Sequence, residues 1–303
     1  MERIFPRSLR KGDTIGIVAP CWEMKPERLE APVKTLEKMG YRVRFARNLF
    51  SSANEFAGSV EERAKDFNDM IADPEVKAVL FGGGEVGNEI LPYIDYRQIV
   101  CHPKILSSYS DGTTILNAVH SQTGLITFYG ASPRTFGEAV DYNLRSFEKR
   151  TGSFDRIYEK SGDWKVICPG KCQGTLTGGY LVNYAALYGL PYFKRPNNKR
   201  YVLFIEDHKM FSSPAVVSKW FANLEMYGGF ENVAGLIFGH YAEEEYPVID
   251  HILRRLGEKH RIPVVRCDDF GHGTYASTLP IGIECAMDTE TGTFTLLESA
   301  VSE

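Results

Sequence analysis

The chain has 303 residues and a mass of 34.1 kDa, which favours one large domain or two smaller ones and excludes a mini-protein. Its 43% hydrophobic and 24% charged residues are typical of a globular protein rather than a disordered one. The net charge is −4 and no block of basic residues occurs, which argues against a nucleic-acid partner bound through phosphates.

The first half alternates short apolar runs with helical patterns. Strands are expected at 14–19, 42–46, 76–81, 104–106 and 125–129, and helices at 29–39, 61–72 and 111–121. Such an alternation predicts an α/β fold, in which helices cover both faces of a parallel sheet.

The periodicity fades between 151 and 174, where turn formers mix with charges as in a connection between domains. We therefore expect one domain over 1–165 and a second over 166–303. In the second part, helices are expected at 181–190, 216–227 and 248–256, strands at 201–205, 234–238 and 264–267, and a hairpin at the end. This mixture predicts an α+β second domain.

Two further patterns bear on the setting of the protein. No segment approaches the roughly 20 apolar residues that span a bilayer, and the start lacks the long apolar run of a signal peptide. We therefore expect a cytoplasmic protein without a membrane partner. Of six scattered cysteines only Cys168 and Cys172 lie close together, and without a C-x-x-C motif they favour buried thiols over a zinc site.

Ser110 occupies the most informative position, between an expected strand and an expected helix in ILSSYSDGTTILNAV. A serine on such a turn exposes its hydroxyl with the helix amides behind it, as in a nucleophile elbow. The alternative is that Ser110 or Asp111 only caps the helix. The strict G-x-S-x-G pattern is absent, because Ser108 and Gly112 flank the serine.

Two strand ends in the second half supply partners for a serine nucleophile. Glu206 follows the strand at 201–205, and His272 follows the strand at 264–267 in a glycine-containing loop. Glu206 could instead be a surface ion-pair partner and His272 an ordinary loop histidine. A metal held by Asp268, Asp269 and His272 is a further alternative, but no fourth ligand stands at a diagnostic spacing.

The glycine-rich run FGGGEVG at 81–87 follows an expected strand. Consecutive glycines let a backbone approach a ligand closely, so the run could bind a phosphate or donate amides to an oxyanion. It does not fit the dinucleotide fingerprint G-x-G-x-x-G.

Taken together, the chain resembles the serine LD-carboxypeptidases, peptidase family S66, which also contain the microcin C7 self-immunity peptidases. The matching segments occur in the family's order: KGDTIGIVAP, GSVEERAKDFNDMIADPEVKAVLFGGGEVGNEILPYIDY, PKILSSYSDGTTILNAVHSQTGLITFYGASP, GTLTGGYLVNYAALYGLPYF, LFIEDH and FGHGTYASTLPIGIECAMD.

This resemblance implies a role for each candidate residue. Ser110 would be the nucleophile, Glu206 the orienting carboxylate and His272 the general base, with the backbone amides of Gly84 and Asp111 as oxyanion donors. It also implies a flavodoxin-like N-terminal nucleophile domain, a smaller β-rich C-terminal domain with Glu206 and His272, a homodimer, and no metal or organic cofactor.

Three positions depart from the family pattern and bear on substrate specificity: Ser108, Val86 and Tyr180. The resemblance implies hydrolysis of an L-D peptide bond in a murein tetrapeptide, and the alternative substrate is an aminoacyl-nucleotide. Because the expected connector is short and holds only Trp164, the murein peptide is favoured. A non-catalytic ligand-binding module is less favoured, and no arginine can be singled out as a clamp for a terminal carboxylate.

Overall fold

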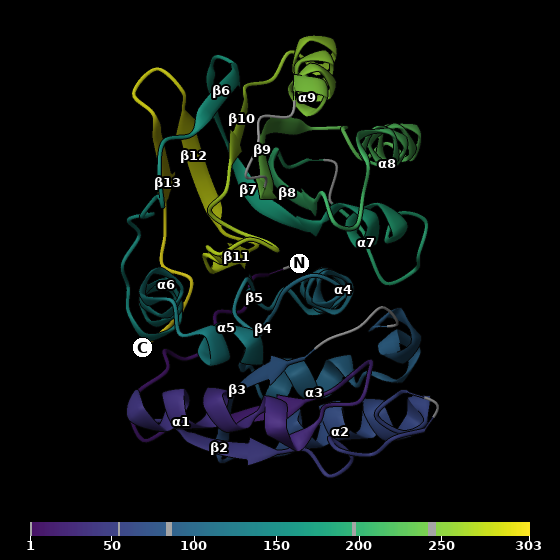
Figure 1. The fold of residues 1–303 in the computed structure, drawn as a ribbon, viewed down its shortest axis with the longest axis vertical. Coiled ribbons are helices and arrows are strands. Elements are labelled where there is room, and N and C mark those ends of the chain that lie inside the picture. Colours follow the sequence, from purple (N-terminus) through teal and green to yellow (C-terminus); the bar gives the residue numbers. More distant parts are fainter. Residues whose placement is uncertain (1, 54, 83–86, 196–197, 242–246) are drawn as a thin grey trace.

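Two β-sheets form the framework of the computed structural model (Figure 1), which describes residues 2–53, 55–82, 87–195, 198–241 and 247–303. The first sheet has the order β11-β5-β4-β3-β1-β2 and the second β13-β12-β7-β8-β9-β10-β6. The chain is therefore a mixed α/β protein with two sheets, as expected.

The first sheet is parallel apart from one edge strand. Its strands are β1 (Thr14–Val18), β2 (Arg42–Phe45), β3 (Val76–Phe81), β4 (Ile105–Ser108), β5 (Thr127–Tyr129) and β11 (Leu279–Ile281). The first five pair in parallel in the flavodoxin-like order 2-1-3-4-5. β11 comes from the far end of the chain and pairs antiparallel with β5, so the second half completes the first sheet.

The second sheet is parallel at its centre and antiparallel at its edges. Its strands are β6 (Lys165–Cys168), β7 (Lys171–Tyr180), β8 (Tyr201–His208), β9 (Val233–Tyr241), β10 (Val264–Cys267), β12 (Glu284–Asp288) and β13 (Thr293–Leu296). The run β7-β8-β9-β10 is parallel, and the expected terminal hairpin is present as β12 and β13.

Helices pack along both sheets. Those of the first half are α1 (Glu30–Lys38), α2 (Val60–Ala72), α3 (Tyr96–Cys101), α4 (Gly112–Thr123), α5 (Pro133–Glu138) and α6 (Asp141–Gly152), with 3-10 turns at Pro26–Arg28 and Gly87–Tyr93. The second half contributes α7 (Leu181–Ala186), α8 (Pro214–Met226) and α9 (Pro247–His260), which lie together on one side of the second sheet in Figure 1. None of the helices in the described part of the chain is both long and apolar enough to cross a membrane.

Local sequence explains most of these elements. At α2, Ser59 and Glu62 form a capping box, and the face with Ala64, Phe67 and Ile71 is buried. α4 is buried on nearly every side, because it is enclosed between the two halves of the chain.

The expectation that 151–174 is a plain connection is wrong in part. β6 and the start of β7 fall inside it, separated only by Pro169 and Gly170. β6 is an edge strand whose side chains at Lys165 and Val166 are exposed, so it lacks a continuous apolar run. Pairing with β10, which is distant in sequence, makes it a strand.

The core is continuous between the two halves. One cluster of buried side chains joins first-sheet residues such as Leu106 and Phe128 to Phe204 and Ile237 of the second sheet. A separate cluster lies between the other face of the second sheet and α7 to α9.

Candidate active site

Ser110 lies on a sharp turn between β4 and α4. Its φ of 56° is in the left-handed region, which non-glycine residues seldom adopt and which is typical of a nucleophile elbow. A Cβ at Gly112 would lie 2.3 Å from Ser108 Oγ, so the turn has room only for glycine there. The N-cap of α4 is Asp111, whose side chain makes no capping hydrogen bond, so capping does not account for the serine.

A chain of hydrogen bonds links Ser110 to His272 and Glu206. Ser110 Oγ lies 2.8 Å from His272 Nε2, and the Glu206 carboxylate lies 3.0 Å from His272 Nδ1. Because a carboxylate can only accept, Nδ1 carries the proton and Nε2 is free to accept the serine proton. Residues 162 positions apart in sequence therefore meet with the geometry of a serine-histidine-carboxylate triad.

Glu206 and His272 are held by tight local packing. Glu206 is 1% exposed, which excludes a surface ion pair, and it lies within β8 rather than after it, because β8 continues to His208. Gly271 has a φ of +99°, and a Cβ there would lie 2.6 Å from the Glu206 carboxyl carbon. Only glycine therefore lets the histidine loop approach the carboxylate so closely.

The surroundings of His272 act on its pKa in opposite directions. Burial lowers it, whereas the charge of Glu206 and its hydrogen bond raise it, and the net pKa lies above the ordinary 6.5. Rings of Tyr109, Tyr180 and Phe211 surround the imidazole with centroids 4.9–5.2 Å away. These rings restrict water around the histidine and strengthen its electrostatic coupling to Glu206.

Tyr129 also belongs to the site, although it was not predicted from the sequence. Its hydroxyl donates to Glu206 Oε1 at 2.6 Å and accepts from the backbone N–H of Ser110 at 3.0 Å. Burial, followed by the Glu206 charge, raises the tyrosine pKa well above its usual value, so the hydroxyl stays protonated and keeps donating. The only signal in the sequence is its place at the end of β5, beside the end of β4.

The alternative role of Asp268, Asp269 and His272 as metal ligands is not supported by a ligand cluster among the described residues. Asp269 accepts hydrogen bonds from Ser161 and from Trp164 Nε1, so its carboxylate is engaged by the segment before β6. Within the residues that the structure describes, no group of three histidine, cysteine, aspartate or glutamate side chains could hold a metal ion.

Of the other residues that the sequence pointed to, some lie outside the described part of the chain and others lie close to the triad. Gly84 and Val86 lie outside the described residues, so the expected oxyanion donor of the glycine-rich run stays a prediction, as does the amide of Asp111. Ser108 fits the turn, because its hydroxyl is buried and donates to the Phe81 carbonyl at 3.0 Å. Tyr180 lines the imidazole, as described above.

Two pockets meet beside Ser110. A pocket of about 80 Å³ is lined by Ser110, Tyr109 and the ends of β1 and β3, where the strand order of the first sheet reverses. Tyr109 and Gly82 also line a second pocket of about 390 Å³, which carries Arg28 and Arg134. Arg134 donates to Glu138 at 2.6 Å and to the Tyr109 hydroxyl at 3.3 Å.

Comparisons with known proteins show the family to which the chain belongs. Residues 15–130 match the family model of the LD-carboxypeptidase N-terminal domain, and residues 173–287 match that of the C-terminal domain. A Bacillus subtilis protein named "Probable murein peptide carboxypeptidase" is 30% identical, over 98% of this chain and 95% of that protein.

Solved structures show the same fold. An MccF-like protein of Bacillus anthracis superimposes with a TM-score of 0.89 at 25% identity, covering 97% of this chain and 99% of that one. The microcin C7 self-immunity protein MccF in complex with aspartyl sulfamoyl adenosine superimposes with a TM-score of 0.86 at 26% identity, covering 99% and 100%. The chain therefore belongs to the LD-carboxypeptidase family, peptidase family S66.

Proposed function

We propose that the protein is a serine-type carboxypeptidase that releases the C-terminal D-amino acid of a murein tetrapeptide by hydrolysing an L-D peptide bond. The observation that carries this proposal is the hydrogen-bonded series Ser110, His272 and Glu206, at 2.8 Å and 3.0 Å. The 30% identical relative named for murein peptides supports the substrate class.

In the proposed reaction, His272 Nε2 takes the proton of Ser110 while Oγ forms a bond to the scissile carbonyl carbon. The oxyanion is stabilised by backbone amides, for which Asp111 and Gly84 are the candidates. The imidazolium then gives its proton to the departing amine as the C–N bond breaks, which leaves an acyl-enzyme. A water molecule, deprotonated by the same nitrogen, releases the acid and restores Ser110.

We assign recognition of the terminal carboxylate to Arg134. That carboxylate lies within about one residue length, roughly 3.8 Å, of the departing nitrogen, so its partner must belong to the same cleft. Arg134 reaches the cleft through Tyr109, which also contacts the imidazole. Among the described residues Arg134 Nη2 has no hydrogen-bond partner, and an arginine edge suits bidentate binding of a carboxylate.

The second candidate is hydrolysis of an aminoacyl-nucleotide amide, which the similarity to MccF with a bound aspartyl sulfamoyl adenosine favours. Trp164, the tryptophan of the segment before β6, packs against Tyr158 and Phe294 and donates to Asp269. Its ring is engaged within the protein, so it does not offer a stacking platform for a base. This packing favours the peptide substrate.

The test is a substrate panel with wild type and Ser110→Ala. Mass spectrometry should show release of D-alanine from an L-D tetrapeptide, and Ser110→Ala should reduce kcat/KM by about 10⁴-fold or more without a change in thermal stability. More than about a tenth of wild-type activity in that variant would reject the serine mechanism. Preferential cleavage of aspartyl sulfamoyl adenosine would select the second candidate, and failure of a fluorophosphonate to label Ser110 would favour a binding module.

The role of Arg134 is tested with the tetrapeptide and its C-terminal amide. Wild type should prefer the acid, and Arg134→Gln should raise KM for the acid about tenfold or more while changing the amide little. Lys65→Gln is the matched control, because it removes the cation of another i,i+4 ion pair on α2. If Arg28→Gln abolished the preference for the acid over the amide and Arg134→Gln retained it, recognition of the terminal carboxylate would be assigned to Arg28 instead.

We also propose that the protein acts in the cytoplasm as a homodimer. Cys101, Cys168, Cys172, Cys267 and Cys285 form no disulfide bond, which suits a reducing compartment. The dimer rests on the family resemblance, and light scattering at working concentration tests it.

A further inference from the structure

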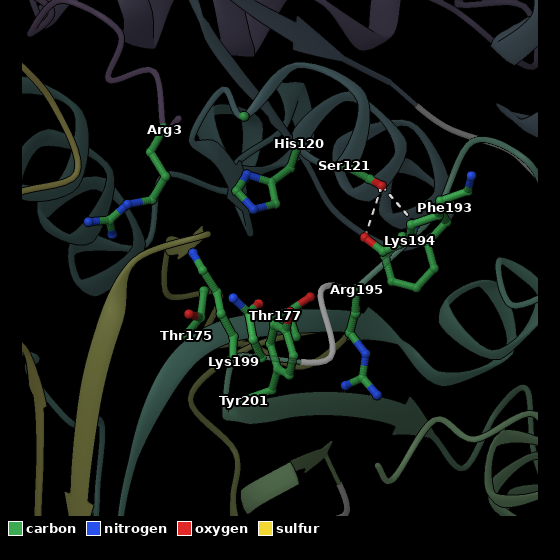
Figure 2. Close-up of a pocket in the computed structure, with 12 residues that line it drawn as sticks. Arg3, His120, Ser121, Thr175, Thr177, Phe193, Lys194, Arg195, Lys199 and Tyr201 are labelled. Atoms are coloured by element: carbon green, nitrogen blue, oxygen red, sulfur yellow. Dashed lines mark hydrogen bonds between the residues drawn. The ribbon is translucent and has the colours of Figure 1, made fainter. Parts of the chain in front are cut away.

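A third pocket lies at the opposite end of α4 from Ser110 (Figure 2). It has a volume of about 170 Å³ and is bordered by the N-terminal segment, the end of α4, β7 and the segment before β8. Arg3 and His120 come from the first half of the chain, and Thr175, Lys199 and Tyr201 from the second. The pocket therefore lies where the two halves meet.

The charges around this pocket are unbalanced. Four cations line it, Arg3, Lys194, Arg195 and Lys199, and its described lining includes no acidic residue. Arg3 is paired with Glu298. For the other three, no carboxylate of the described residues lies within ion-pair distance, in a protein whose net charge is −4.

Arg195 is the most constrained of these cations. Its guanidinium lies over the rings of Tyr188 and Tyr201, with centroids 5.4 Å and 4.7 Å away. Nη2 donates to two backbone carbonyls, whereas Nε and Nη1 are buried without a hydrogen-bond partner among the described residues. The two rings and two carbonyls therefore satisfy the guanidinium only in part, since no carboxylate of the described residues pairs with it.

Figure 2 shows His120 and Lys199 pointing into the hollow from opposite sides. His120 Nδ1 lies 2.9 Å from the Leu125 carbonyl, which fixes the proton on Nδ1 and leaves Nε2 as an acceptor. Burial, and then the charges of Lys199 and Arg3, lower the pKa of His120 to about 4, so the ring is neutral near pH 7. The pocket thus combines cations with a neutral acceptor.

We propose that this pocket binds hydrogen phosphate, which bridges the two halves of the chain. Its negative oxygens would meet Lys199 and Arg3, and its P–OH would donate to His120. The volume suits a small oxyanion, because pockets for larger organic ligands usually span about 300–1,000 Å³. A bound anion would also relieve the repulsion between cations that face one another across the junction.

The test is independent of the proposed enzymatic activity. Saturating phosphate should raise the midpoint of thermal unfolding by about 2–4 °C, compared with the protein in sodium chloride of equal ionic strength. Titration calorimetry should show one phosphate-binding site per chain. Sulfate lacks a hydrogen to donate at neutral pH and should bind about tenfold more weakly. Glycerol 3-phosphate should also bind more weakly, because the free ion fills the pocket.

Lys199→Gln should weaken phosphate binding at least tenfold and raise the thermal midpoint of the phosphate-free protein, because it removes one of the repelling cations. Lys65→Gln, on the exposed face of α2, should leave both quantities unchanged, and Arg3→Gln tests the site from the other half. Unsaturable binding, unchanged binding in Lys199→Gln, or equal binding of sulfate would overturn the proposal. Tighter binding of glycerol 3-phosphate would overturn the assignment to the free ion.

Discussion

His272 can act as a base only when its imidazole is neutral. Burial lowers its pKa and Glu206 raises it, and the net pKa lies above 6.5. As the pH falls, His272 therefore becomes protonated at a higher pH than an ordinary histidine does. We therefore expect kcat/KM to rise with pH and to reach half its maximum above pH 6.5. Steady-state kinetics between about pH 5 and 9 would measure this.

Glu206→Gln provides the control for this pH profile. It keeps the shape of the side chain and removes the charge that raises the histidine pKa, so the midpoint of the residual activity should move to lower pH. A flat profile in the wild type, with chemistry limiting kcat/KM, would contradict a histidine base.

Tyr129 connects the two ends of the triad, since one hydroxyl contacts both Glu206 and the Ser110 backbone. We expect Tyr129→Phe to lower kcat about 10–100-fold with little change in KM, because it disturbs the orientation of Glu206 and of the elbow without contacting substrate. The pH midpoint should shift as well, which a purely structural defect would not cause. Tyr96→Phe, whose hydroxyl donates to the Leu91 carbonyl away from the triad, serves as control.

Ser110, Glu206 and His272 could be proposed from the sequence because each lies near the carboxyl end of a strand, and such ends converge in α/β sheets. Tyr129 could not be predicted from the sequence, and neither could the role that we propose for Arg134. The contacts of Tyr129 join side chains distant in sequence, because 77 positions separate it from Glu206. No local pattern distinguishes such a tyrosine from an ordinary core residue.

At the level of elements, α6 holds the loop that follows His272, a role that could not be predicted from its sequence. Its buried Asn143 donates to the Thr274 carbonyl at 3.0 Å and accepts from the Ala276 amide at 2.6 Å, which fixes the loop after His272. No helix is predicted here from the sequence, because DYNLRSFEKRTG is largely polar and has a single narrow apolar face. Edge strand β6 was missed for a similar reason, because pairing rather than periodicity defines it.

We expect Asn143→Ala to destabilise the fold by about 2 kcal/mol, because it removes two hydrogen bonds to the histidine loop, each worth about 1 kcal/mol. It should also lower kcat/KM about tenfold by loosening the histidine loop. Urea unfolding and kinetics would measure the two effects. Arg145→Ala on the same helix is the control, since that side chain is 55% exposed, and an equal loss in both variants would contradict a specific role for Asn143.

At the scale of the whole molecule, the two halves are interlocked rather than merely adjacent. β11 completes the first sheet, and the last residues return to the N-terminal segment, where Ser302 exchanges backbone hydrogen bonds with Ser8 and Pro6. One apolar cluster runs through both sheets. The division at 165 expected from the sequence remains a prediction, and from this topology we expect that neither side is stable alone.

We therefore expect the full chain to unfold in a single transition, although chains of this length often unfold in several steps. Differential scanning calorimetry should give a calorimetric enthalpy equal to the van't Hoff enthalpy. The fragment 1–165 lacks β11 and exposes both the edge of β5 and the apolar face that packs against the second sheet, so it should fail to fold cooperatively. Two separate transitions, or a cooperatively folded fragment, would show that the halves are independent domains and that the triad forms by docking of two stable units.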